Sequence, residues 1–243
     1  MTGLDDTDLE YILRLRVPLA SKGRDPTNEI MKSPKFKEWL VTSLPQELLI
    51  HGNSDSQPIS PLSFFCAMLV RNLRSVNTFR PMTFFCGRHI HQDYGGGRTM
   101  IISLLTQLLQ QQHFDLGFIR SEDAYQMNHG NIEAFCYIFG SLVQQVKTTE
   151  SVFCVIDGIN FYERSEDLLQ EMAYVLRFLL DLTKGRTVFK ILITSPSTTE
   201  DVRQAIKDDN YLALPEPARN TQPFSNLRFE RQVNEELEMQ ELP

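Results

Sequence analysis

The sequence predicts an α/β domain in which helices cover both faces of a parallel β-sheet. Short apolar runs without polar alternation, such as residues 152–156 and 188–193, are typical of strands that are buried on both sides. Longer amphipathic stretches separate these runs, and this order indicates crossover helices between parallel strands. At 243 residues, the chain is long enough to build one such domain around a sizeable core.

Helices are expected before the sheet begins. Acidic residues at positions 5–8 are typical of a helix N-terminus, and the apolar residues that follow share one face up to about residue 16. The polar residues 20–28 are predicted to be a linker. Ser33 followed by Pro34 is typical of a helix start, and Trp39 lies on the apolar face of that helix. Residues 1–29 are therefore expected to form an N-terminal helix and linker.

Strands and helices alternate from residue 48 onward. The predicted strands are residues 48–50, 82–86, 152–156, 188–193 and 211–214. The predicted helices are residues 60–76, 99–112, 131–146 and 166–184. These elements make residues 30–215 one domain with a five-stranded sheet. The polar and acidic remainder, residues 216–243, is predicted to be a mobile tail with room for a short helix.

Charge and hydropathy exclude two classes of partner. A formal net charge of −7 without a cluster of basic residues argues against nucleic-acid binding, which needs grouped Lys and Arg. The most apolar stretch is interrupted by Arg177 and Asp181, so no membrane span is expected. All four cysteines lie within apolar runs, as reduced and buried thiols do, and this predicts a cytoplasmic protein.

The first predicted strand ends where a nucleotide-binding protein would carry its phosphate-binding loop. That motif reads G-x-x-x-x-G-K-[ST], and its backbone amides hold phosphate while Lys and a hydroxyl neutralise and order the ligand. Aligned on Gly52, this chain has Gln57, Pro58 and Ile59 in place of the second Gly, the Lys and the hydroxyl residue. A one-residue shift would let Ser60 supply the hydroxyl, but no lysine lies within reach.

The third and fourth predicted strands end in residues that a magnesium site could use. The third strand ends in Asp157, as a magnesium-binding strand does, and the fourth ends in Thr194. Related ATPases place two further acids after the first one, to orient magnesium and water. Here those positions hold Asn160 and Phe161, so the acids needed for hydrolysis are missing.

Five segments together resemble the N-terminal NTPase region of fungal NACHT/STAND-like proteins, and more closely a degenerate fungal branch of that group. They are residues 48–53, 84–89, 104–109, 152–163 and 191–196, in the order that the family has them. The resemblance covers roughly residues 30–215 and implies a P-loop NTPase-like sheet with the strand order 5-1-4-3-2. It also implies that Pro196 replaces a common arginine, and that the helical lid, winged-helix and repeat domains are absent.

These features predict a catalytically inactive pseudo-NTPase domain that works as a protein-interaction or regulatory module. Its partner is expected to be a protein, and no cofactor is expected. The alternative is a weak or unconventional NTPase that binds ATP or GTP with magnesium through remnants of the site, namely Gly52, Ser60, Asp157 and Thr194. A third hypothesis is an unrelated small-molecule enzyme that uses the crevice near Asp157 and Thr194.

Two further motifs have a simpler explanation that we favour. Gly95, Gly96 and Gly97 precede a predicted helix and could bind an anion at its N-terminus, but a flexible crossover loop explains them as well. Residue types suited to zinc occur just after the second strand, but a polar loop often collects such residues and no second ligand pair accompanies them. They are Cys86, His89, His91 and Asp93.

Overall fold

A parallel sheet of five strands forms the centre of the protein, which we describe from a computed structural model of residues 3–15, 26–53, 57–90, 95–215 and 226–238. The strands are β1 (Gln46–His51), β2 (Phe79–Phe85), β3 (Ser151–Asp157), β4 (Val188–Ser195) and β5 (Tyr211–Ala213). They lie in the order β2-β3-β4-β1-β5 and every neighbouring pair is parallel. The predicted α/β class and the order 5-1-4-3-2 are confirmed.

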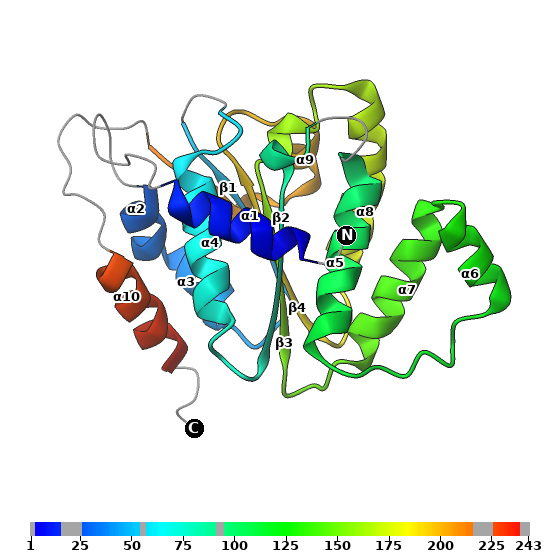
Figure 1. The fold of residues 1–243 in the computed structure, drawn as a ribbon. Helices are drawn as coiled ribbons and strands as arrows, with labels where there is room; N and C mark the ends of the chain where they lie inside the picture. The colour runs from blue at the N-terminus through cyan, green and yellow to red at the C-terminus, as the bar shows by residue number, and fades with distance from the viewer. Residues whose placement is uncertain (1–2, 16–25, 54–56, 91–94, 216–225, 239–243) are drawn as a thin grey trace.

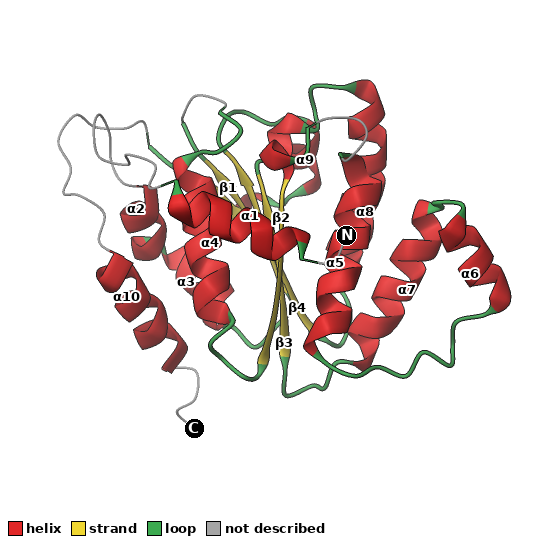
Figure 2. Cartoon of the chain, in the orientation of Figure 1, coloured by secondary structure: helices red, strands yellow, loops and turns green. Residues whose placement is uncertain are grey.

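Helices cover both faces of the sheet in two layers (Figures 1 and 2). One layer contains α2 (Pro26–Lys32), α3 (Pro34–Val41), α4 (Pro61–Leu73) and α10 (Asn226–Glu238). The other contains α5 (Gly96–Gln111), α7 (Ile132–Gln145) and α8 (Glu166–Leu182). In β4, Phe189, Ile191 and Ile193 enter the α5–α7–α8 core, while Leu192 enters the other core. Because the strand is buried on both sides, most of its residues are apolar, and this run makes the strand recognisable in the sequence.

The remaining elements are short. They are α1 (Leu4–Arg14), α6 (Ser121–Asn128), α9 (Asp201–Ala205) and the 3-10 turns η1 (Cys86–Arg88), η2 (Ile159–Phe161) and η3 (Asp208–Asn210). Helix α1 runs across edge strand β2, and α6 lies on the outer side of α7, away from the sheet (Figure 1). Among the described residues, no helix is both long and apolar enough to cross a membrane.

The structure differs from the predicted boundaries at two places. Helix α2 begins within the expected linker, and its Ile30 and Met31 are buried against the core. Helix α10 is the short helix for which the predicted tail left room, but its Phe229 and Val233 are buried against the domain, as side chains of a mobile tail would not be. Four-residue spacing of apolar side chains gives α10 a face that packs against α3 and α4, so its burial outweighs its polar composition.

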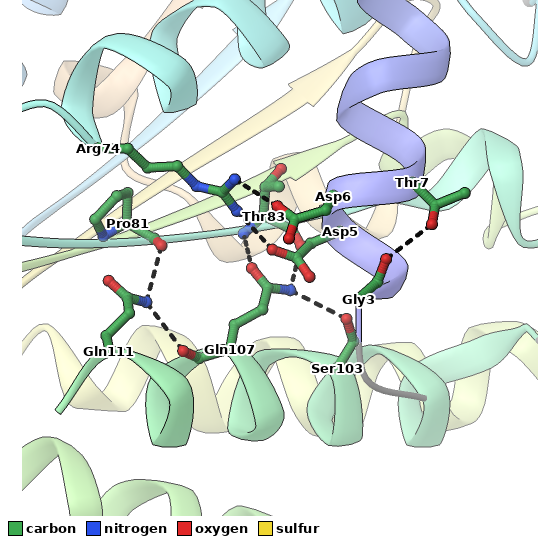
Figure 3. A network of polar contacts seen from close by, with 10 residues as sticks. All are labelled: Gly3, Asp5, Asp6, Thr7, Arg74, Pro81, Thr83, Ser103, Gln107 and Gln111. Atoms are coloured by element: carbon green, nitrogen blue, oxygen red, sulfur yellow. Dashed lines mark hydrogen bonds and ion pairs between the residues drawn. The ribbon is translucent and has the colours of Figure 1, made fainter. Parts of the chain in front are cut away.

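Side chains of α5 close the outer edge of β2, which has no neighbouring strand. Gln107 donates from Nε2 to the Thr83 carbonyl and accepts from the Thr83 amide, each at 2.8 Å, and Gln111 donates to the Pro81 carbonyl at 3.0 Å (Figure 3). Arg80 donates to the Phe79 carbonyl. Together these groups satisfy backbone atoms that would otherwise invite another strand.

A buried lysine lies on the face of the sheet that α3 and α4 cover. Lys190 in β4 is fully buried, donates from Nζ to the Leu40 carbonyl at the end of α3 (2.8 Å), and lies 5.1 Å from the centre of the Phe153 ring. Burial lowers the pKa of this ammonium group to about 7, because the charged form loses its hydration. The helix C-terminus provides one partner, which only partly offsets that loss.

Replacing Gln107 should destabilise the domain through the β2 edge. In Gln107→Leu, the buried amide and carbonyl of Thr83 lose their partner, and we expect a loss of about 3 kcal/mol in the free energy of unfolding. Urea denaturation of this variant, with the exposed neighbour Gln110→Leu as control, measures the difference. Equal effects of the two substitutions would mean that Gln107 does not carry the edge.

Lys190 should make the protein more stable as the pH rises. A lysine whose folded-state pKa is lowered gives up its proton on folding, so the free energy of unfolding increases between about pH 7 and pH 10 and stays at its lower level below that window. In Lys190→Met this slope should disappear, and the variant should gain roughly 5 kcal/mol at pH 6. The exposed Lys147→Met serves as control, and thermal unfolding across the pH range is the measurement. An unchanged slope in Lys190→Met would refute the assignment.

Candidate functional site

Polar side chains meet at the edge of the sheet where the strands end. The register pairs Ile156 of β3 with Ile193 of β4, so Asp157 and Thr194 follow at the same level on neighbouring strands. Thr194 in turn pairs with Ile50 of β1, two residues before Gly52. The expectation that these residues share one edge therefore agrees with the sheet, and both polar side chains point toward α4.

Asp157 is the centre of this cluster. Its Oδ1 accepts a hydrogen bond of 2.6 Å from the Thr194 hydroxyl, and the Ser63 hydroxyl of α4 bonds to the same carboxyl group. The Gly158 amide donates to Thr194 Oγ1 at 3.4 Å. Burial raises the pKa of Asp157 to about 6, and the bonds from Ser63 and Thr194 oppose that rise by favouring the ionised form.

The N-terminus of α4 is capped by its own side chains. Ser60 Oγ accepts from the amides of Leu62 (3.1 Å) and Ser63 (3.3 Å), and the Ser60 amide donates to Ser63 Oγ at 3.0 Å. Pro61 has no amide proton, and the Phe64 amide donates to the Ser60 carbonyl. The donors that a helix N-terminus would offer to a phosphate are thus already used inside the protein.

The segment that precedes this helix lies against the ends of β2 and β3. A Cβ placed on Gly87, in η1, would lie 2.0 Å from the carbonyl oxygen of Pro58, so the two backbones are in direct contact. A Cβ on Gly158, which follows Asp157, would lie 3.5 Å from the Gly87 amide nitrogen. Asp157, which precedes Gly158, is only 1% exposed to solvent. Residues 54–56, the middle of the aligned phosphate-binding loop, lie outside the described residues.

Two predicted site residues have other roles than expected. Gly52 donates from its amide to the Ser195 carbonyl at 2.8 Å, and a Cβ there would lie 3.0 Å from the Leu62 side chain and 3.3 Å from the Pro196 carbonyl. Gly52 is therefore a tight packing position in this structure. Ser60 is a helix cap, and the hydroxyl next to Asp157 belongs to Ser63, which the alignment on Gly52 missed. The signal that could have located it is Ser60 followed by Pro61, which is typical of a helix start and places Ser63 at the third helical position, where it completes the capping box.

The residues after Asp157 join the ends of β3 and β4. Asn160 donates from Nδ2 to the Ser197 hydroxyl at 2.9 Å, and Phe161 is buried in the core. Glu163 accepts from the Val202 amide at 3.0 Å and from the Thr199 hydroxyl, so it caps α9. The nearest acid in this segment is therefore bound elsewhere and does not approach Asp157.

The glycine-rich start of α5 carries an internal carboxylate. Glu171 of α8 accepts from the Arg98 amide at 3.2 Å and pairs with its guanidinium at 2.9 Å. A Cβ on Gly97 would lie 2.2 Å from the Glu171 carbonyl oxygen, so the glycine permits close packing of α5 on α8. Glu171 occupies the place that an external anion would take, and Gly96 and Gly97 are part of a packed helix start instead of the flexible crossover loop that we favoured.

The zinc hypothesis receives no support from the described residues. His91 and Asp93 lie outside them, and His89 binds Asp8 of α1 through Nε2 at 2.6 Å. Cys86 is buried, and burial raises the pKa of its thiol, so the thiolate that binds metal is disfavoured. Within the described part of the chain, no group of three potential metal ligands occurs.

Comparison with known proteins identifies a family and, among solved structures, a distant similarity. The family model described as nephrocystin 3, N-terminal, matches residues 27–196, which is well over half of the chain. No curated protein matches the sequence. Among solved structures, the ORC2 protein of Aeropyrum pernix in its ADPNP–ADP complexes is similar with a TM-score of 0.46 and 11% identity. The match covers 82% of this chain and 48% of that one, so this chain spans about half of its length, and a similarity this low carries no argument about activity.

Asp157 should make the protein less stable as the pH rises from 4 to 6. An acid whose folded-state pKa is raised contributes stability below its unfolded pKa, near 3.8, and that contribution is lost as the pH passes about 6. Asp157→Asn keeps an acceptor for Thr194 and removes the charge. We expect the slope to vanish and stability at pH 7 to rise by about 3 kcal/mol. Chemical denaturation at a series of pH values tests this, with the exposed Asp209→Asn as control. A destabilised Asp157→Asn at pH 7 would show that the charge itself is needed.

Proposed function

The chain belongs to the nephrocystin 3, N-terminal family, and we propose that it is a catalytically inactive P-loop NTPase-like domain that acts as a protein-interaction or regulatory module. The observation that carries this proposal is the capping box of α4, in which Ser60 and Ser63 use the amides that would bind phosphate. A P-loop NTPase needs those amides free and needs a lysine beside them. In this chain the first basic residue after Gly52 is Arg71, which pairs with Glu230 of α10.

The finer assignment rests on the sequence. We propose that the chain is a degenerate member of the fungal NACHT/STAND-like group, because its strand-end segments resemble that group in order. Four buried free cysteines support a reducing location, the cytoplasm. A domain of this kind keeps its buried sheet while its chemistry is lost, since the core and the site depend on different residues.

One arrangement favours the alternative, weak binding of ATP or GTP with magnesium. In P-loop NTPases a hydroxyl at the start of the helix and an acid at a strand end hold the metal. Ser63 and Asp157 adopt that relation, and Thr194 lies beside them. Magnesium requires an ionised carboxylate with room for several water ligands, whereas Asp157 is buried and has a raised pKa. The pair fits the metal only if Asp157 becomes accessible to water.

Titration calorimetry decides between the two functions. With ATP or GTP and magnesium, we expect no binding at concentrations up to about 100 μM, which corresponds to a limit near 5.5 kcal/mol. The reason is that Leu62 and Ser63 already donate their amides to Ser60. A dissociation constant in the low micromolar range would contradict the pseudo-NTPase proposal and support the alternative.

A rebuilt motif tests the reason for the loss. The triple variant Gln57→Gly, Pro58→Lys and Ile59→Ser restores the G-x-x-x-x-G-K-S spacing, and we expect weak binding at most and no hydrolysis. Adding Ser60→Ala releases the two capped amides and should strengthen binding, whereas the exposed Ser141→Ala on α7 should not. Hydrolysis by the triple variant would show that the catalytic acids are not at the positions of Asn160 and Phe161.

A further inference from the structure

Helix α1 precedes the residues that the family model matches, yet it is packed into the domain. The match begins at residue 27, and α1 ends at Arg14. Leu9 and Ile12 are buried in the core on the α4 side. The helix contacts α4, β2 and α5, so it crosses the edge of the sheet (Figure 1). An element outside the matched region therefore lies against the elements that lead into the candidate site.

Acidic side chains attach α1 at two points. At its N-terminal end, Asp5 and Asp6 pair with Arg74 at 2.5 and 2.6 Å, as Figure 3 shows. One turn later, Asp8 accepts from Arg88 Nε at 3.2 Å and from His89 Nε2 at 2.6 Å. Only 5% of the Asp8 side chain is exposed, so this second attachment is shielded from water and from salt.

One partner of Asp8, Arg88, belongs to the turn that contacts the candidate site, and the other, His89, follows that turn directly. Arg88 is the last residue of η1, and its guanidinium also lies 4.0 Å from the centre of the Tyr11 ring of α1. Gly87 of the same turn is in backbone contact with Pro58 and lies next to Gly158, the neighbour of Asp157. On the inner side, the Tyr162 hydroxyl donates to the His89 carbonyl at 2.9 Å. Turn η1 is thus held from outside by α1 and from inside by the core.

We infer that α1 is a latch on the candidate site: Asp8 fixes turn η1 against the Pro58 segment, and release of α1 frees this segment to move away from Asp157. The inference rests on the proposed function only in its location, since it concerns the site that we propose to be inactive. Because Gly87 and Pro58 touch through backbone atoms, any displacement of η1 removes the surface on which the Pro58 segment rests. A partner that competes for the acids of α1 would need basic side chains in place of Arg74 and Arg88.

Hydrogen exchange of the whole chain without nucleotide tests the latch. Asp8→Asn keeps the side-chain volume and removes the charge, and Asp8→Ala removes both. We expect amide exchange at residues 57–60 and 86–89 to become about tenfold faster in Asp8→Ala and to rise less in Asp8→Asn. Exchange in β4 should stay unchanged, which shows that the fold is retained. The control is Glu10→Gln on the exposed side of the same helix, where Glu10 pairs with the exposed Arg14.

Two results would overturn the inference. In the first, exchange rises in α1 alone while residues 57–60 and 86–89 keep their protection, so α1 would only pack against the surface. In the second, exchange rises equally in β4, so Asp8 would serve global stability. If Asp8→Ala does not fold, Asp8→Asn and Arg88→Gln provide the same comparison from the two sides of the contact. The outcome is independent of the nucleotide titration, so failure of the latch and failure of the proposed function are distinguishable.

Discussion

The parallel sheet brings the ends of its strands to one edge, and the polar groups that meet there need partners inside the protein. In this chain Asp157, Thr194, Ser63 and Ser60 bind one another, and the first-turn amides of α4 bind Ser60. A buried donor or acceptor without a partner costs more than a hydrogen bond returns, so this network has little freedom to take up a ligand. The same requirement that stabilises the edge therefore removes the means of binding a phosphate.

Elsewhere in the domain, too, side chains of the protein bind backbone groups that could otherwise bind a ligand or another strand. Glu171 occupies the N-terminus of α5, where an anion could have bound, and Gln107 occupies the edge of β2, where a strand could have paired. At the opposite edge, Lys35 donates to the Tyr211 carbonyl of β5 at 3.0 Å. Each contact satisfies a backbone group that fold and chain direction leave open. Together they describe a sheet closed to extension at the positions where side chains reach its outer strands.

The sequence predicts the sheet well because buried parallel strands contain runs of apolar residues without polar alternation, as in β3 and β4. It predicts less where long-range packing decides. Helix α6 buries none of its residues, so it has no apolar stripe to reveal it, and α10 is recognisable only once α3 and α4 provide a surface. The alignment on Gly52 missed Ser63 because the position of its hydroxyl depends on where α4 begins and not on the distance from Gly52. The role of Glu171 depends on its contact with Arg98, 73 residues earlier in the sequence, and no local sequence pattern reveals such a contact.

Asp157 and Lys190 lie near opposite ends of the strands and carry opposite charges when ionised. Both are buried, and both have a pKa moved toward neutrality by lost hydration. The cost of burying Lys190 is partly offset by its hydrogen bond to the C-terminus of α3, and this contact has a structural role. The cost of burying Asp157 is partly offset by hydrogen bonds from two hydroxyls, which belong to the elements that form a nucleotide site in P-loop NTPases. An apolar residue would fill either position at lower cost, since unpaired burial of an ionisable group is unfavourable. The carboxylate at the strand end is therefore a feature of this domain that packing alone does not explain.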